Sequence, residues 1–270
     1  RFLARLFGEV LCDEGDHATV LVATSGDTGS AVARGFAGVP RTRVVVLYPA
    51  GKVSPFQEAQ MATIGGNVTA VRVHGVFDDC QRLVKAALLD PDLAPLRLSS
   101  ANSINIGRLL PQLFYYVTGH LAVAAAPSIP VVFVVPSGNL GNLTAGVMAA
   151  RMGLPVSRFV AATNVNDVLP EYLESGSFRP RPSVPTVSNA MDVGDPSNFA
   201  RLAAFYGSSA ARMREAITGV PVTEAATRAE IRETYRRTGV VLDPHAAVAC
   251  AAARRVGAGA HAPVIALATA

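Results

Sequence analysis

The sequence predicts an α/β protein made of two three-layer α/β/α domains with mostly parallel sheets. Half of its 270 residues are apolar, which is enough for more than one hydrophobic core. Ala, Val and Leu dominate, and aromatic residues make up only 6%. This composition favours helices packed on parallel strands over an all-β sandwich. Short apolar runs also alternate with helical stripes along the chain, as expected of strands joined by crossover helices.

The first part of the chain, residues 1–100, predicts a smaller domain. Its opening stretch, residues 2–11, repeats its apolar positions on one helical face. Ser54-Pro55-Phe56-Gln57 has the Ser cap, the early Pro and the Gln of a helix start. Apolar runs predict strands at 18–24, 43–48 and 68–73, and helical patterns predict helices at 28–36, 54–64 and 80–88.

The rest of the chain, residues 101–270, predicts a larger domain with the same alternation. Apolar positions from Ile106 to Val117 repeat with helical spacing, so we expect one helix there, with Pro111 in its first turn or at a kink. Residues 176–200 are rich in Pro, Ser and Asn and predict a long functional loop. Strands are expected at 130–135, 159–163 and 263–268, and helices at 143–152, 223–238 and after Asp243-Pro244.

Charge and cysteine content narrow the class of protein. The net charge of +4 suits an anionic small substrate, and no basic run is interleaved with aromatic residues, so nucleic acid is not an expected partner. The three cysteines lie far apart and form no zinc-binding pattern, so we expect a cytoplasmic protein without a metal site. Arg, Asp, Gly or Pro interrupts every apolar run, so no membrane partner is expected. The sequence leaves the oligomeric state open.

A glycine-rich turn, Ser137-Gly138-Asn139-Leu140-Gly141-Asn142, follows one predicted strand and opens a helix. In such a turn the backbone N–H groups can surround an anion, and the helix N-terminus adds positive potential. The turn lacks the Lys-Ser/Thr of a Walker A loop, and its Gly-x-x-Gly is too short for a dinucleotide fingerprint. Phosphate is therefore the expected ligand, and a plain tight turn is the alternative.

Two further polar segments have the composition of binding loops. Thr24-Ser25-Gly26-Asp27-Thr28-Gly29 also joins a strand to a helix. Its hydroxyl, N–H and carboxylate groups either grip a carboxylate or phosphate, or only cap the helix. Asn102-Ser103-Ile104-Asn105 precedes Arg108, which shares a helix face with Asn105. This segment predicts either a donor-rich surface or a helix cap followed by a surface arginine.

Together with their neighbours, these segments resemble the threonine synthase family over residues 1–270. The resemblance is carried by the stretches VATSGDTGSAVA, LYPAGKVSPFQEAQM, SANSINIGRLLPQ, VPSGNLGNLTAG, AATNVND and SNAMDV. It implies a fold of the tryptophan synthase β type and pyridoxal 5′-phosphate (PLP) as cofactor. It also implies the conversion of O-phospho-L-homoserine and water to L-threonine and phosphate, a carbon–oxygen lyase reaction of threonine biosynthesis.

The resemblance also implies roles for individual residues. The glycine-rich turn would hold the cofactor phosphate, Thr269 would contact the pyridine nitrogen, and Asp27 would stand where relatives often have Asn. The implied cofactor-binding residues are Asp27, Gly138, Asn139, Leu140, Gly141, Asn142 and Thr269. The implied substrate-binding residues are Thr24, Ser25, Gly26 and Thr28 in the carboxylate loop, and Lys52, Asn102, Ser103, Asn105 and Arg108 around the phosphate.

The lysines depart from the family pattern. The family's cofactor-binding lysine would precede the segment that matches Arg1, and neither Lys52 nor Lys85 fits its place. We therefore expect a piece of the enzyme that also stops before the family's C-terminal segment and is inactive by itself. The alternatives are another PLP lyase of the same fold, such as a hydroxyamino-acid deaminase, and a non-catalytic homologue. Lys52 and Arg108 disfavour the deaminase, because its substrate has no phosphate.

Overall fold

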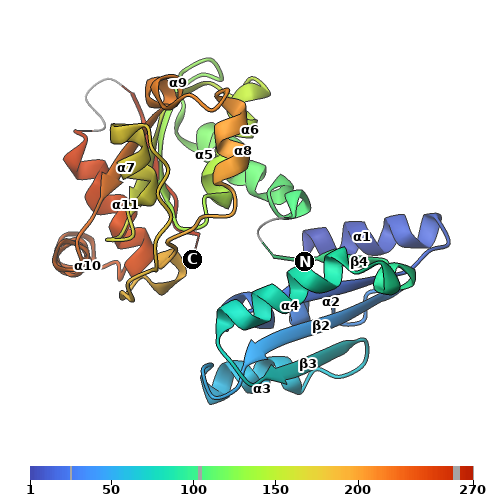
Figure 1. The fold of residues 1–270 in the computed structure, drawn as a ribbon. Helices are drawn as coiled ribbons and strands as arrows, with labels where there is room; N and C mark the ends of the chain where they lie inside the picture. The colour runs from blue at the N-terminus through green and yellow to red at the C-terminus, as the bar shows by residue number, and fades with distance from the viewer. Residues whose placement is uncertain (25, 103–104, 258–261, 270) are drawn as a thin grey trace. The chain divides into compact units, whose positions relative to one another are not determined.

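The computed structural model describes residues 1–24, 26–102, 105–257 and 262–269, apart from the side chains of Asp27 and Asp78. The chain divides into two compact units, Arg1–Pro111 (the first unit) and Gln112–Ala270 (the second unit). The sequence places the division earlier, near residue 100. Both units have parallel sheets covered by helices, which confirms the α/β fold class (Figure 1).

The first unit is built on a four-stranded parallel sheet. Its strands are β1 (Ala18–Ala23), β2 (Thr42–Pro49), β3 (Val68–Val73) and β4 (Leu98–Ser100). Its α-helices are α1 (Phe2–Asp13), α2 (Asp27–Phe36), α3 (Pro55–Ala62) and α4 (Phe77–Leu89). Its 3₁₀ turns are η1 (Pro91–Leu96), η2 (Ile106–Arg108) and η3 (Leu110–Gln112), the last of which reaches into the second unit. The strand order is β3-β2-β1-β4, so β1 lies inside the sheet.

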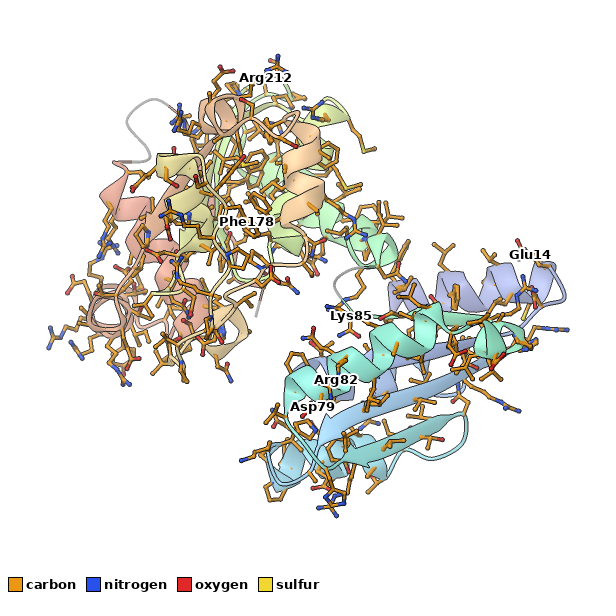
Figure 2. The ribbon with its side chains drawn as sticks, viewed as in Figure 1. Glu14, Asp79, Arg82, Lys85, Phe178 and Arg212 are labelled. Carbon is orange, nitrogen blue, oxygen red and sulfur yellow. The ribbon has the colours of Figure 1, made fainter. Side chains whose placement is uncertain are left out.

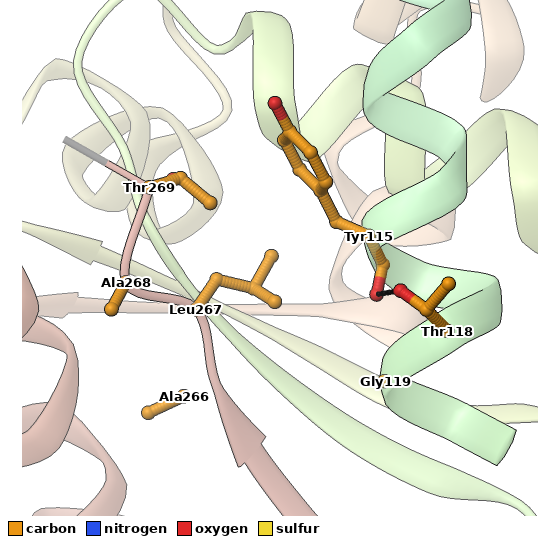
Figure 3. Close-up of a pocket in the computed structure, with 7 residues that line it drawn as sticks. All are labelled: Tyr115, Thr118, Gly119, Ala266, Leu267, Ala268 and Thr269. Carbon is orange, nitrogen blue, oxygen red and sulfur yellow. Dashed lines mark hydrogen bonds between the residues drawn. The ribbon is translucent and has the colours of Figure 1, made fainter. Parts of the chain in front are cut away.

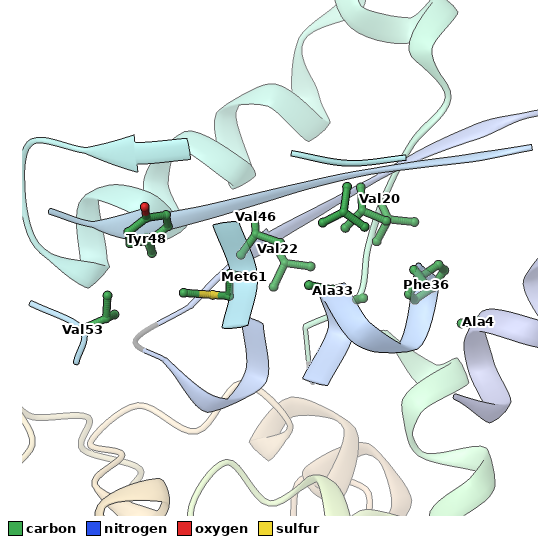
Figure 4. Packing of buried hydrophobic residues seen from close by; sticks show 12 residues of the cluster. Ala4, Val20, Val22, Ala33, Phe36, Val46, Tyr48, Val53 and Met61 are labelled. Carbon is green, nitrogen blue, oxygen red and sulfur yellow. The ribbon is translucent and has the colours of Figure 1, made fainter. Parts of the chain in front are cut away.

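Every residue of β1 is buried, because helices cover both of its faces. Successive side chains of a strand point to opposite faces, so neighbouring residues of β1 enter different cores. Val22 packs with Met61 of α3 and with buried residues of α1 and α2 (Figure 4). Leu21 packs with Val84 of α4. The apolar run that predicted this strand is therefore explained by burial on both sides.

The second unit is built on another four-stranded parallel sheet, in the order β7-β6-β5-β8. Its strands are β5 (Val131–Pro136), β6 (Val156–Thr163), β7 (Ile217–Pro221) and β8 (Val264–Ala266). Its helices are α5 (Leu113–Val123), α6 (Gly141–Arg151), α7 (Val168–Ser175), α8 (Phe199–Phe205), α9 (Ala210–Ala216), α10 (Glu224–Thr238) and α11 (Pro244–Arg255), with the 3₁₀ turn η4 (Asn189–Met191).

The two faces of this sheet also pack against helices. On one face Val134 of β5 joins a core that contains Val248 of α11. On the other face Tyr116 of α5 packs edge-on against Phe133 and Phe159, with ring centroids 4.9 and 6.1 Å away. Gly146 of α6 makes room for the tyrosine, since a Cβ there would lie 2.5 Å from the ring. Tyr116 is thereby held, fully buried, between α6 and the sheet.

Some elements differ from those that the sequence predicts. The single helix expected from Ile106 to Val117 is wrong: η2 and η3 come first, and α5 starts only at Leu113. Pro111 explains the delay, because its ring and missing N–H are incompatible with a helix interior. The expected strand 263–268 is limited to β8, and the sequence does not predict β4, β7, α7, α8 or α9. None of the helices in the described ranges is long and apolar enough to cross a membrane.

Candidate functional site

At the carboxyl end of β5, the glycine-rich turn leads directly into α6. Ser137 is tied to the sheet, because its N–H donates to the Ala162 carbonyl of β6 at 2.7 Å. Leu140 precedes the helix in a left-handed conformation, with φ of 60°. It has no polar side chain to cap the first turn, as a Ser or Asp would. The backbone N–H groups of that turn therefore suit an external anion, which the helix dipole also favours.

The two asparagine side chains of the turn bind neighbouring parts of the protein. Oδ1 of Asn139 accepts hydrogen bonds from the N–H and the hydroxyl of Ser197, at 2.6 and 2.9 Å. The Tyr116 hydroxyl lies 2.9 Å from Oδ1 of Asn142 and 2.8 Å from its backbone oxygen. Nδ2 of Asn142 donates to the Thr269 hydroxyl at 2.9 Å. These amides hold the turn in place, so the groups of the turn that suit an anion are those of its backbone.

Thr269 lies beside an open pocket of about 490 Å³ between α5 and the segment that follows β8 (Figure 3). Burial raises the pKa of Tyr116 well above its usual value, so this hydroxyl stays protonated at neutral pH. A chain of hydrogen bonds thus runs from Tyr116 through Asn142 to Thr269. The pocket is lined by Tyr115, Thr118, Gly119, Ala266, Leu267, Ala268 and Thr269.

In the first unit, the segment after β1 is shaped by Thr24. Its buried Oγ1 accepts hydrogen bonds from the N–H groups of Gly26 at 2.9 Å and Gly29 at 2.8 Å. Gly26 has φ of 147°, which favours glycine, and it is the residue before α2. Thr28 is half-buried in the first turn of that helix. Ser25 and the side chain of Asp27 lie outside the described part of the chain.

The polar residues around β4 are also engaged with backbone. Asn102 accepts from the Ala23 N–H at 3.2 Å and donates to the Ala23 carbonyl at 2.9 Å, so its amide extends β4 along β1. Asn105 donates to the Ser100 carbonyl at 2.7 Å and accepts from the Gly107 N–H at 2.8 Å. The two asparagines therefore build the turn before η2. Ser103 lies outside the described residues.

The cationic residues of the first unit differ in their surroundings. Arg108 is half-buried, and its Nη1 donates to the Ala101 carbonyl at 3.1 Å, which fixes the guanidinium beside the same turn. Lys52 is exposed in the turn after β2. Lys85 is exposed on α4, on the same helix as Asp79 and Arg82 (Figure 2), which form an ion pair of 2.8 Å. Lys85 therefore belongs to a solvated helix face.

Each sheet gathers its predicted segments at one edge, because the carboxyl ends of parallel strands lie together. In the first unit, the described segments after β1, β2 and β4 supply Thr24 and residues 26–28, Lys52, and Asn102 with residues 105–108. In the second unit, the segments after β5 and β8 supply residues 138–142 and Thr269. No three His, Cys, Asp or Glu side chains of the described residues are grouped to hold a metal ion.

The sequence does not single out the residues that support the glycine-rich turn. In the sequence, nothing distinguishes Tyr116 from the other aromatic residues of its helix. Its contact with Asn142 depends on how α5 packs against the second unit's sheet. Asp192 and His245 lie near the turn only in the folded chain. Asn164 lies in the stretch AATNVND, and Asp192 lies in SNAMDV. The many polar residues of these stretches, at a strand end and in a loop, were the signal that could have indicated the support of the turn.

Comparison with known proteins places the chain in a family. Residues 1–269 match the family described as "Pyridoxal-phosphate dependent enzyme". The chain belongs to this family of pyridoxal-phosphate-dependent enzymes. The cofactor of this family carries a phosphate, an anion of the kind that the start of α6 suits.

Similar proteins within the pyridoxal-phosphate-dependent family are named threonine synthase. The chain is 45% identical to that of Serratia marcescens over 94% of its own length and 58% of the relative's. It is 45% identical to that of Escherichia coli K12, over 94% of its own length and 59% of the relative's. The chain therefore spans about three-fifths of the length of these relatives.

Solved structures that are similar to this chain include threonine synthases as well. A PLP-bound threonine synthase from Brucella melitensis matches with a TM-score of 0.89 and 39% identity, over 99% of this chain and 63% of that one. The Escherichia coli threonine synthase matches with a TM-score of 0.85 and 41% identity, over 100% and 63%. A threonine deaminase from Solanum lycopersicum, at 16% identity and a TM-score of 0.72, shares the fold.

Proposed function

We propose that the protein is a threonine synthase, which converts O-phospho-L-homoserine and water to L-threonine and phosphate with PLP as cofactor. The observation that carries the proposal is the glycine-rich turn at residues 138–142, which opens α6 without a side-chain cap and is linked by Asn142 to the hydroxyl of Thr269. The turn would receive the phosphate of the cofactor, and the Thr269 hydroxyl would receive its pyridine nitrogen, both at the carboxyl ends of the second unit's strands. The 45% identity to threonine synthases supports this reaction over others of the fold.

The residues of the second unit fit the cofactor. At Gly138 a Cβ would lie 2.8 Å from Met191 Cα, so only a bare backbone fits here, and bare backbone is what a closely bound phosphate requires. Gly138, Leu140 and Gly141 would hold the phosphate through backbone groups, with Asn139 and Asn142 fixing the turn. When bound, PLP supplies an electron sink for the α-carbon of an amino acid. Thr269 would meet the pyridine nitrogen with a neutral hydroxyl, which leaves that nitrogen less protonated than a carboxylate would.

The first unit suits the amino-acid end of the substrate. Thr24 holds this loop by accepting hydrogen bonds from the N–H groups of Gly26 and Gly29, and the positive end of the α2 dipole would favour the substrate carboxylate. We assign Ser25, Gly26 and Thr28 to this loop, with Thr24 shaping it. Asp27, at the first position of α2, would contact the cofactor.

The substrate phosphate requires cationic donors, because it gains charge as its bond to the γ-carbon breaks. Arg108 can donate two parallel hydrogen bonds to a phosphate, and Lys52 adds a mobile positive charge. Asn102, Ser103 and Asn105 would complete the pocket, with the two asparagines holding its backbone. Water then adds at the β-carbon, and the residues around the substrate must admit one water while they retain the phosphate.

A hydroxyamino-acid deaminase of the same fold is the alternative. Its substrate has no phosphate and would need neither Lys52 nor Arg108. The cellular location that we propose is the cytoplasm, because Cys12, Cys80 and Cys250 are all free thiols.

The test uses protein expressed from the whole open reading frame that contains these residues, supplied with PLP. We expect release of inorganic phosphate and formation of threonine from O-phospho-L-homoserine. Arg108→Leu should lower kcat/KM by roughly tenfold to a hundredfold, because a charged hydrogen bond contributes about 1.5 to 3 kcal/mol. PLP affinity should not change. Arg82→Leu, on the solvated face of α4, is the matched control. Formation of a 2-oxo acid from threonine without phosphate-dependent synthesis would instead favour the deaminase.

A further inference from the structure

The loop from Val184 to Asn198, which we call the backing loop, lies directly against the glycine-rich turn. At Gly138 a Cβ would be 2.8 Å from Met191 Cα and 2.9 Å from the Ala190 carbonyl oxygen. The two backbones are therefore in contact with no side chain between them. Farther along the backing loop, Asn198 donates to the Asn139 carbonyl at 3.0 Å. Any shift of the backing loop must move the turn or open a gap behind it.

His245, at the start of α11, fixes one point of the backing loop. The Ala190 N–H donates to Nε2 of His245 at 3.2 Å, so Nε2 carries no proton in this arrangement. The proton of the neutral ring is then on Nδ1, which lies 3.1 Å from Oδ1 of Asp243. Asp243 is itself fixed as the N-cap of α11. A rigid helix thus holds Ala190, next to the residue that touches Gly138.

Asp192 fixes the other side of the same contact. Its Oδ1 accepts hydrogen bonds from the hydroxyl of Thr186 at 2.7 Å, from Asn164 at 2.8 Å and from Asn166 at 3.2 Å. Its Oδ2 accepts from the Thr186 N–H at 2.8 Å. Asn166 also donates to the Val184 carbonyl at 2.9 Å. The carboxylate therefore links the backing loop to the segment that follows β6. It also joins two parts of the backing loop, because Thr186 belongs to the same loop.

We propose that His245 and Asp192 are positioning residues for the phosphate of the cofactor. By holding the backing loop on both sides of Met191, they press its backbone against Gly138 and keep the N–H groups of residues 138–142 aimed at one anion. Neither residue needs to touch the ligand. This inference rests on the proposed phosphate-binding role of the glycine-rich turn, and it assigns a role to the motif SNAMDV that the reaction chemistry does not use.

A purely structural role would have a different signature. If His245 only stabilised the second unit, its loss would lower the affinity for every ligand of the pocket. If His245 positions the glycine-rich turn, its loss should lower the affinity only for ligands that carry a phosphate. Pyridoxine 5′-phosphate and pyridoxine make this comparison, because they share the ring and differ in the phosphate. Neither has the aldehyde that would react with lysines.

The experiment is calorimetric titration of the 270-residue chain with the two compounds. We expect His245→Ala to bind pyridoxine 5′-phosphate roughly threefold to tenfold more weakly, as expected for the loss of one hydrogen bond. Affinity for pyridoxine should stay unchanged. His74→Ala, at an exposed histidine of the first unit, is the control and should change neither affinity. Equal weakening of both compounds, or no weakening of either, would overturn the positioning role.

A second variant guards against a folding defect. Asp192→Asn keeps the shape of the side chain but turns one acceptor into a donor that faces other donors. It should show the same selective loss for the phosphorylated compound, and an unselective loss would count against the inference. The wild-type chain serves as a test of the underlying site. If it does not prefer pyridoxine 5′-phosphate to pyridoxine, the phosphate-binding turn itself is wrong, and the positioning role is lost with it.

Discussion

At Gly29, the lack of a side chain allows α2 to pack against β1 and α3. A Cβ at this position would lie 2.4 Å from Thr24 Cγ2 and 2.6 Å from Met61 Sδ, and both of those residues are buried. Gly29→Ala should therefore lower the free energy of unfolding by about 1 to 3 kcal/mol. The change would also disturb the Thr24 oxygen that holds the loop. Urea unfolding followed by circular dichroism measures the effect.

The same helix provides the control for this substitution. A Cβ at Gly35 would have its nearest neighbour at 3.5 Å, an ordinary contact. Gly35→Ala should leave the stability unchanged or raise it by up to about 1 kcal/mol, because alanine is the better helix former. Equal effects of the two substitutions would show that packing at Gly29 is not the cause.

Tyr116 gives the second unit a stability that depends on pH. Burial raises its pKa well above the usual value, so the folded chain keeps a proton that the unfolded chain loses above about pH 10. The unfolded state then binds fewer protons, and the stability falls as pH rises, by at most about 1.4 kcal/mol per pH unit for this group. Tyr116→Phe should make the decline between pH 8 and 11 less steep. Parallel declines in the two proteins would contradict this.

The sequence predicts which polar residues belong to the candidate site, but it does not predict their hydrogen-bond partners. Asn102, Asn105 and Asn142 were expected to face ligands, and the described contacts of their amides are with neighbouring groups of the protein. Periodicity places a residue at a strand end, but its partner depends on tertiary packing. Asn102 meets Ala23 only because β4 pairs with β1 across a long stretch of chain. Such a pairing has no local signal.

At the scale of elements, burial explains several of the strands that the sequence predicts correctly, although the largely exposed edge strand β3 is predicted correctly as well. β1, β2 and β5 are short apolar runs because helices cover both faces of each sheet. β7 lacks this signal: its sequence, ITGVP, contains a Gly and a Pro, and it is an edge strand with a single neighbour. The helices α8 and α9 have seven residues each, too few for a clear helical period.

The turn before α6 shows what a local sequence can specify. Its glycines and its position after a strand predict either an anion site or a plain tight turn, because both features act through neighbouring backbone. The support behind it comes from the backing loop and from α11, which are far away in the sequence. The sequence thus predicts a candidate binding surface but not the elements that pack behind it.

At the scale of the molecule, the contacts described above for the glycine-rich turn are with residues of the second unit. Tyr116, the backing loop, His245 and Thr269 lie within Gln112–Ala270. Both faces of that unit's sheet have their own buried core, which does not draw on the first unit. The described contacts around the proposed phosphate site therefore lie in one compact part of the chain.

We accordingly expect residues 112–270, expressed alone, to unfold cooperatively and to keep the preference for pyridoxine 5′-phosphate over pyridoxine. Their affinity for O-phospho-L-homoserine should be lost, because Lys52, Arg108 and the loop after β1 belong to the first unit. Thermal unfolding and calorimetric titration of the two parts of the chain would test this. If the second unit folds but binds both pyridoxine compounds equally, the phosphate site needs residues of the first unit. The assignment of that site to the edge of the second sheet would then be wrong.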